Sequence, residues 1–151
     1  MKTLLIVYHT GGVKTARMAE AVERGARSEA GVRVIVKRCA DAGPEDVLAA
    51  DGLILGTPEN FGYMSGMMKD FLERVFYACE GKVNGRPWAL FVGAGQDGSG
   101  AVSSVERIIL GLRFKKALEP VVAVKELQAN HLTQCEEMGA ALAAGLAMGV
   151  F

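Results

Sequence analysis

The sequence predicts an α/β protein in which a parallel sheet is covered by helices on both faces. Five short apolar segments alternate with helical patterns along the 151 residues, and this alternation is typical of parallel sheets with helical crossovers. Three of the five segments are apolar throughout, as strands buried on both faces should be. Because no linker, repeat or change in composition interrupts the pattern, residues 1–151 are expected to form one domain.

The three fully apolar segments are expected in the middle of the sheet: 3–8, 52–56 and 88–93. In Val32–Arg38 charged and apolar residues alternate, which is typical of a strand with one exposed face. Val121–Val124 is short and follows a proline, a residue that sheets accept at an edge or at the start of a strand. These two segments are therefore expected at the two edges of the sheet.

Helices are predicted where apolar residues recur at intervals of three and four along the chain. Such patterns lie at 15–29, Gly66–Cys79 and 101–114, and a short helical turn is expected after Pro44. Thr133 and Glu136 have the spacing of a capping box, in which the two side chains satisfy free N–H groups at a helix start. The last helix is therefore expected to begin at Thr133.

The charge balance and the cysteines exclude several classes of protein. With 17 basic and 17 acidic side chains the formal net charge is zero, so no basic excess exists for a nucleic-acid partner. Half of the residues are hydrophobic, which excludes disorder. The three cysteines are scattered without zinc-binding spacing, which predicts no metal site and a reduced, cytoplasmic protein. The N-terminal apolar run is too short for a signal peptide, and no membrane span or membrane partner is expected.

The loops after the first, third and fourth strands are the expected ligand site. In parallel sheets, ligands bind beyond the carboxyl ends of the strands, at the point where the strand order reverses. Glycine has no side chain, so it allows the backbone to approach a ligand closely. Eight of the 19 glycines fall in these three loops: Gly11, Gly12, Gly56, Gly62, Gly93, Gly95, Gly98 and Gly100.

The first loop, 9–15, has the features of a phosphate-binding loop. Backbone N–H groups at a helix N-terminus bind anions, and Thr10 and Thr15 add hydroxyl donors. The loop matches neither a Walker sequence nor a G-x-G-x-x-G fingerprint, and it has no cysteine nucleophile. Lys14 either pairs with the phosphate or is solvated. The alternative for the whole loop is a tight turn with a threonine cap.

The second loop, 56–65, is long for a connection between a strand and a helix, and long loops are usually functional. Pro58, Glu59 and Asn60 offer a rigid backbone and polar groups, and Phe61 and Tyr63 add aromatic surface. These parts suit a flat heteroaromatic ligand. The alternative is that the two aromatic side chains form a lid over the local core.

The third loop, 93–100, is rich in glycine and carries polar side chains at Gln96, Asp97 and Ser99. Its composition suits either close approach of the backbone to a ligand or a flexible surface loop.

The run Gly-Thr-Pro-Glu-Asn-Phe-Gly-Tyr-Met-Ser at 56–65, with the helix after it, resembles the G-[ST]-P-x-x-[FY]-G-x-[MP]-[AS] motif of flavodoxin-like FMN proteins. The resemblance is nearest to the NAD(P)H-dependent FMN and quinone reductases related to the tryptophan-repressor-binding protein. It covers essentially the whole chain through the order of strands and helices. It implies a flavodoxin-like fold, with a five-stranded parallel sheet in the order 2-1-3-4-5, and a bound FMN.

The resemblance also implies a role for each loop. The first loop would hold the FMN phosphate, the second would line the isoalloxazine ring and ribityl chain, and the third would contact the pyrimidine edge of the ring. In the first loop Gly12 and Val13 replace the inner threonine and the glycine of the family's [ST]-x-T-G-x-T pattern. The cofactor-binding residues are therefore expected to be Thr10, Gly11, Gly12, Val13, Lys14, Thr15, Pro58, Glu59, Asn60, Phe61, Gly62, Gly93, Ala94, Gly95 and Gln96.

The activity that the resemblance implies is an FMN-dependent oxidoreduction. NAD(P)H would reduce the flavin, and a quinone or a free flavin would then take the electrons, in ping-pong order. FMN supplies this chemistry itself, so no catalytic side chain is required. His131 either donates a proton to the acceptor or is an exposed histidine before a helix.

Two alternatives to the reductase are an electron-transfer flavodoxin and a non-catalytic FMN-binding module. A carrier usually holds its ring between aromatic side chains and presents an acidic surface. Here the third loop has no aromatic residue and the net charge is zero, and both features favour the reductase. The apolar tail 140–151 is either core or an oligomer face, and relatives suggest a homodimer or homotetramer.

Overall fold

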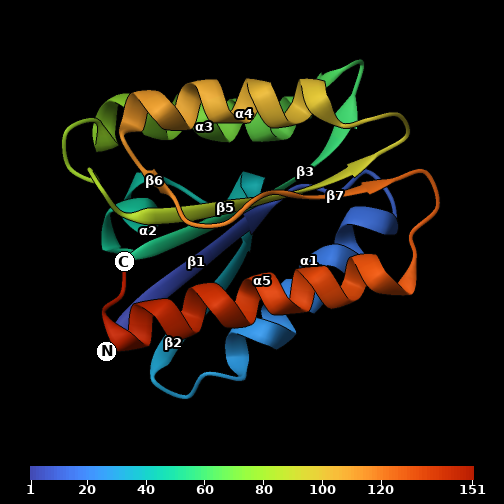
Figure 1. Cartoon of the computed structure of the whole chain (residues 1–151). Coiled ribbons are helices and arrows are strands. Elements are labelled where there is room, and N and C mark those ends of the chain that lie inside the picture. The colour runs from blue at the N-terminus through green and yellow to red at the C-terminus, as the bar shows by residue number, and fades with distance from the viewer.

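The computed structural model describes all 151 residues and places a mostly parallel sheet between two layers of helices (Figure 1). Its strands are β1 (Lys2–Tyr8), β2 (Val32–Arg38), β3 (Gly52–Asn60), β4 (Tyr63–Met64), β5 (Pro87–Ala94), β6 (Lys115–Lys116) and β7 (Val121–Val124). Its helices are α1 (Lys14–Arg27), α2 (Pro44–Ala49), α3 (Gly66–Cys79), α4 (Ser99–Leu112) and α5 (Ala129–Met148), with a short 3₁₀ turn at Cys39–Asp41.

The sheet has the expected order. The long strands lie in the order β2-β1-β3-β5-β7, all parallel, with β7 at one edge beside the end of β5. The predicted order 2-1-3-4-5 is therefore confirmed, with β5 and β7 as the fourth and fifth strands. Two strands of two residues each were not predicted: β4, which pairs antiparallel with β3, and β6, which pairs with the start of β5.

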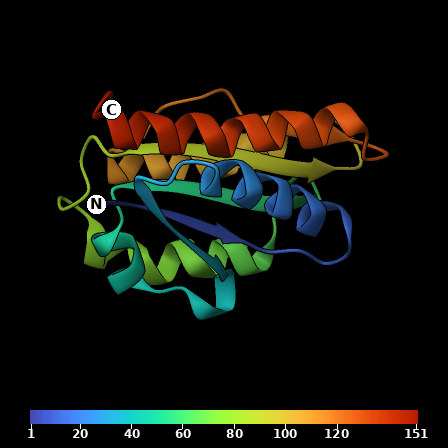
Figure 2. The same cartoon turned by 90° about the horizontal axis from the view of Figure 1, so that it is seen from below.

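The two faces of the sheet carry separate hydrophobic layers. Helices α3 and α4 cover one face, and α1 and α5 cover the other (Figures 1 and 2). Successive side chains of a strand point to opposite faces, so in β1 Leu5 and Val7 pack in the layer of α3 and α4, while Leu4 and Ile6 pack in that of α1 and α5. The strands with no exposed face account for the continuous apolar segments of the sequence.

Helices α1 and α5 pack through glycines. A Cβ atom added to Gly25 would lie 1.9 Å from the carbonyl oxygen of Glu136, and one added to Gly139 would lie 2.0 Å from that of Val22. Both distances are far inside van der Waals contact, so the two backbones touch where the side chains are absent. Glycine is required here for helix packing.

The largest differences from the predicted element boundaries are at α5 and β3, while the helices predicted at 15–29 and 101–114 are observed one or two residues earlier, as α1 (Lys14–Arg27) and α4 (Ser99–Leu112). Helix α5 begins at Ala129 and not at Thr133, because the ring nitrogen Nδ1 of His131 accepts a hydrogen bond from the N–H of Gln128 at 2.9 Å and so caps the helix. Thr133 lies inside the first turns and its hydroxyl donates to the Ala129 carbonyl at 3.2 Å. Strand β3 continues to Asn60, four residues beyond the expected end at Gly56.

The apolar C-terminal tail is divided between core and surface. Leu142, Ala143 and Leu146 of α5 are buried against the sheet, whereas Met148 and Val150 at the end of the chain are exposed. None of the helices is both long and apolar enough to cross a bilayer.

We expect Gly139→Ala to lower the free energy of unfolding by about 1–3 kcal/mol, because the added methyl group must push α5 away from α1. Urea denaturation followed by circular dichroism measures this change. Gly66→Ala is the matched control, since a Cβ at this helical position meets nothing within 4 Å. Equal midpoints for Gly139→Ala and the wild type would contradict the close contact.

Candidate functional site

A cavity of about 380 Å³ lies at the carboxyl edge of the sheet, where the connections after β1, β3 and β5 meet. These connections lie together at the right-hand end of the sheet in Figure 1. The cavity brings together twelve of the predicted cofactor-binding residues: Thr10, Gly11, Gly12, Val13, Lys14, Thr15, Pro58, Glu59, Asn60, Gly93, Ala94 and Gly95. Phe61, Gly62 and Gln96 are not in its wall.

The first loop presents backbone N–H groups at the start of α1. The Thr10 hydroxyl donates to the Gly12 carbonyl at 2.5 Å and accepts from the Gly12 N–H at 3.3 Å, which closes a tight turn. The N–H groups of Gly11 and Val13 have no acceptor in the protein, and the open space around Gly11 and Gly12 leaves the backbone accessible. The Arg38 guanidinium donates to the Thr10 carbonyl at 3.3 Å. The loop therefore combines a capped tight turn with free donors and a nearby positive charge.

Thr15 supplies a free hydroxyl to the cavity. The residue is only 3% exposed, and its hydroxyl makes no hydrogen bond within the protein. Every fully enclosed side-chain oxygen of the protein has a partner, so the Thr15 oxygen must reach the surface of the cavity. A Cβ atom on Gly93 would lie 2.7 Å from this oxygen. Gly93 thus leaves the space that the Thr15 hydroxyl occupies, and the hydroxyl is free to donate into the cavity.

Lys14 lines the cavity, and its ammonium group is bonded to backbone carbonyl oxygens. Its ammonium nitrogen Nζ donates to the carbonyl oxygen of Ala94 at 2.7 Å and also to that of Lys125. Burial lowers the pKa of Lys14 below its usual value. The side chain therefore links the first loop to the ends of β5 and β7.

The second loop is a β-hairpin and not the long irregular connection that the sequence predicts. β3 runs to Asn60, the chain turns at Phe61 and Gly62, and β4 returns antiparallel. Both turn residues have positive φ angles, 55° for Phe61 and 69° for Gly62, as a type I′ turn requires. The Phe61 side chain is fully exposed at the tip. It is therefore not a lid over the core, and this alternative is wrong.

Glu59 joins the hairpin to the third loop. Its carboxylate accepts hydrogen bonds from the backbone N–H groups of Gly98, Gly100 and Ala101, at 3.2, 3.1 and 3.2 Å. These are free donors at the positive end of α4, where an anionic acceptor is most stabilising. The carboxylate is thereby bound to protein groups, and only the rest of Glu59 is available to a ligand. The third loop is held in place by this contact and is not a free surface loop.

The loop glycines divide into two groups. A Cβ added to Gly11, Gly12, Gly62 or Gly95 would meet nothing within 4 Å. The other four lie against the protein itself: Gly56 faces the Phe91 ring, Gly93 faces Thr15, Gly98 faces Val122 and Gly100 faces the Gly62 carbonyl. The expectation that all eight allow close approach to a ligand is therefore wrong for Gly56, Gly98 and Gly100, where the close contact is internal packing. At Gly93 the Thr15 hydroxyl occupies the space that a side chain would need.

The remaining reactive side chains lie outside the cavity. His131 caps α5 and does not line the cavity. His9 precedes the first loop, and burial together with the Arg38 charge lowers its pKa. All three cysteines are buried, and burial raises the pKa of Cys39 and of Cys135 to about 12. None of them supplies a thiolate nucleophile.

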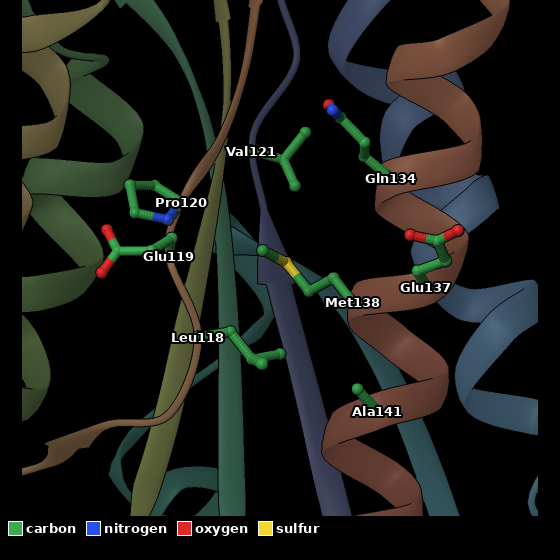
Figure 3. Close-up of a pocket in the computed structure, with 8 residues that line it drawn as sticks. All are labelled: Leu118, Glu119, Pro120, Val121, Gln134, Glu137, Met138 and Ala141. Carbon is green, nitrogen blue, oxygen red and sulfur yellow. The ribbon is translucent and has the colours of Figure 1, made fainter.

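A second hollow of about 420 Å³ lies between α5 and the segment that leads into β7. Met138 of α5 points toward Leu118 and Val121 across it (Figure 3). Its charged groups are the carboxylates of Glu119 and Glu137, and it contains none of the predicted site residues. This hollow therefore does not suit a phosphate-bearing ligand.

Solved structures with the same fold define the class of protein. A flavodoxin from the domain Archaea is similar with a TM-score of 0.81 and 20% identity, over 95% of this chain and 98% of that one. A WrbA-like flavodoxin from Agrobacterium tumefaciens is similar with a TM-score of 0.77 and 23% identity, over 99% of each chain. The molecule is an α/β protein of flavodoxin-like fold with an open cavity at the flavodoxin switch point.

Within this class, the chain belongs to the NADPH-dependent FMN reductase family, whose family model matches residues 40–128. A protein of Aquifex aeolicus (strain VF5) named flavodoxin is 37% identical over 117 residues, which cover 76% of this chain and 63% of that protein. A protein of Acidithiobacillus ferrooxidans (strain ATCC 53993 / BNL-5-31) named NAD(P)H dehydrogenase (quinone) is 34% identical over 113 residues, which cover 61% of this chain and 56% of that protein. The chain thus spans less than two thirds of the length of either relative.

We expect Glu59→Ala to lower the free energy of unfolding by about 1–2 kcal/mol, because three N–H groups of α4 lose their anionic acceptor. Glu119→Ala is the control, since that carboxylate is exposed and pairs only with Lys116, and exposed pairs contribute little. Chemical denaturation of the two variants measures the difference. A Glu59→Ala variant as stable as Glu119→Ala would show that the hairpin is held by other contacts.

Proposed function

We propose that this protein is an FMN-dependent NAD(P)H oxidoreductase that reduces quinones or free flavin. The observation that carries the proposal is the cavity at the carboxyl edge of the sheet, in a chain that belongs to the NADPH-dependent FMN reductase family. One end of the cavity offers free N–H and hydroxyl donors, and the other end is walled by uncharged backbone. We propose residues 1–151 as a single FMN-binding domain.

The donor end fits the phosphate group of FMN. The N–H groups of Gly11 and Val13 and the hydroxyl of Thr15 have no partner in the protein, and they lie at the positive end of α1. The departure from the family pattern at Gly12 removes one side-chain hydroxyl, Val13 replaces a glycine and removes none, and the backbone donors stay in place. The Thr10 hydroxyl, which the sequence also assigns to the phosphate, is already bonded to Gly12.

The other end fits a flat, uncharged ring. Pro58 and Asn60 line one side and Gly93, Ala94 and Gly95 line the other. No aromatic side chain lies in this wall, so one face of the ring stays open to a second molecule. Flat aromatic groups of a nicotinamide and of an acceptor can occupy such a face in turn, which is the requirement of a ping-pong reaction.

FMN, when bound, supplies the exchange of electron pairs between the nicotinamide and the acceptor. The chain contributes binding and orientation: the first loop holds the phosphate, and the hairpin and third loop hold the ring. The contact of Glu59 with the start of α4 keeps the hairpin and the third loop at a constant separation. Neither the Glu59 carboxylate, which is bonded to the start of α4, nor His131, which lies outside the cavity, is placed as a proton donor.

The relatives support a quinone as the acceptor, because two further ones share the name NAD(P)H dehydrogenase (quinone) with the protein of Acidithiobacillus ferrooxidans. A one-electron carrier is the second candidate, and the relative named flavodoxin favours it. The balanced charge of the chain, with 17 basic and 17 acidic side chains, favours small-molecule partners over the basic protein partners that an acidic carrier attracts.

The experiment that tests the proposal is anaerobic mixing of the FMN-loaded protein with NADH and with NADPH. We expect the flavin absorbance near its visible maximum to bleach in one two-electron step with at least one nicotinamide, and to return when a quinone is added. FMN that stays oxidised with both nicotinamides would favour the carrier or a binding module. Failure of the protein to retain FMN would refute the proposal as a whole.

We expect Gly62→Val to weaken FMN binding about tenfold, because a β-branched residue at a φ of 69° strains the turn that shapes the hairpin. Gly81→Val is the matched control: its φ is 80°, it also has open space around it, and it lies between α3 and β5, outside the hairpin. Flavin fluorescence quenching measures both dissociation constants. Equal losses of FMN affinity in the two variants would show that the effect is general destabilisation and not a property of the hairpin.

A further inference from the structure

Lys14 occupies an unusual position for a lysine at the start of a helix. Its Nζ reaches across the cavity floor to the carbonyl oxygens of Ala94 and Lys125, which lie 80 and 111 residues further along the chain. The Lys125 N–H donates to the same Ala94 carbonyl at 2.8 Å, and Lys125 itself has a φ of 60°. The stem of Lys14 packs on Gly93, where an added Cβ would meet its Cγ and Cδ atoms at 3.5 Å.

The charge of this ammonium group is not neutralised by the protein. Lys14 takes part in no ion pair. Glu59 is the one acidic residue in the cavity wall, and its carboxylate is bonded to three N–H groups of α4. The two carbonyl oxygens that Lys14 contacts accept hydrogen bonds from its ammonium group and carry no formal negative charge.

We propose that Lys14 raises the reduction potential of FMN bound in this cavity. The inference rests on the proposed function. When a nicotinamide transfers a hydride, two electrons and one proton pass to the flavin, the nicotinamide becomes a cation, and the flavin ring gains one negative charge. A positive charge in the cavity wall stabilises this charged ring more than the neutral oxidised ring. Reduction by the nicotinamide then becomes more favourable.

A pairing of Lys14 with the FMN phosphate would have a different signature. The phosphate carries the same charge when the ring is oxidised and when it is reduced. Its interaction with Lys14 would therefore strengthen the binding of both forms equally and would leave the potential unchanged. A purely structural role, in which Lys14 holds the loops together, would also affect both forms alike. Only interaction with the ring charge separates the two oxidation states.

The experiment compares the midpoint potential of bound FMN in the wild type, Lys14→Met and Lys14→Gln. Lys14→Met keeps the apolar stem and removes the charge, and Lys14→Gln also keeps a hydrogen-bond donor. We expect both variants to bind reduced FMN about tenfold more weakly relative to oxidised FMN, which lowers the potential by about 30 mV for a two-electron couple. Lys14→Arg retains the charge, so its midpoint potential should lie close to that of the wild type. Dye-coupled anaerobic titration measures the potential without any turnover.

Two control variants separate the explanations. Lys82→Met removes an exposed charge outside the cavity, and we expect no change in potential. Thr15→Ala removes the free hydroxyl, and we expect weaker binding of FMN but not of riboflavin, with the potential unchanged. An unchanged potential in Lys14→Met and Lys14→Gln would overturn the inference, whether or not FMN binds more weakly. Absence of FMN binding to the wild type would instead refute the proposed function.

Discussion

Burial of the three central strands on both faces is the constraint on which the rest of the molecule depends. Strands β1, β3 and β5 lie between two apolar layers, so their faces carry mainly apolar side chains, and the buried Thr57 of β3 is satisfied by hydrogen bonds within the protein. Because the strands are parallel, their carboxyl ends meet at one edge, and the chain leaves the sheet there three times in adjacent positions. Every group available for chemistry is therefore concentrated in the connections at this edge.

These connections are held together by charged side chains that bond to backbone. Glu59 joins the hairpin to the start of α4, and Lys14 joins the first loop to the ends of β5 and β7. Neither contact is an ion pair, so neither depends on a second charged side chain for its geometry. The cavity is consequently formed before any ligand binds, and the free donors of Gly11, Val13 and Thr15 are already in place. Such preorganisation reduces the entropy that binding must overcome.

The same arrangement connects cofactor binding with the direction of electron flow. A wall without aromatic side chains leaves a ring face open, which suits exchange with small molecules more than transfer to a protein partner. A lysine charge in the floor of the cavity favours the reduced ring over the oxidised one. The two properties act together, since an open face admits the nicotinamide and a raised potential favours its reaction. The chain is similar both to a protein named flavodoxin and to one named NAD(P)H dehydrogenase (quinone). One fold can serve both activities when local features, such as the residues of the cavity wall, differ.

The sequence by itself determined the elements whose patterns are local. The apolar runs of β1, β3 and β5 and the periodicity of α3 follow from burial. The strand order was implied by the resemblance of residues 56–65 to flavodoxin-like proteins. Only the tertiary structure decided the partners of long-range contacts. The turn at Phe61 and Gly62 is a hairpin in which β4 pairs with β3 and Glu59 meets the start of α4. Gly56 lies beside the Phe91 ring, although the sequence places it in a loop. No local pattern records that Lys14 reaches Ala94, because that hydrogen bond exists only once β1, β3 and β5 lie side by side.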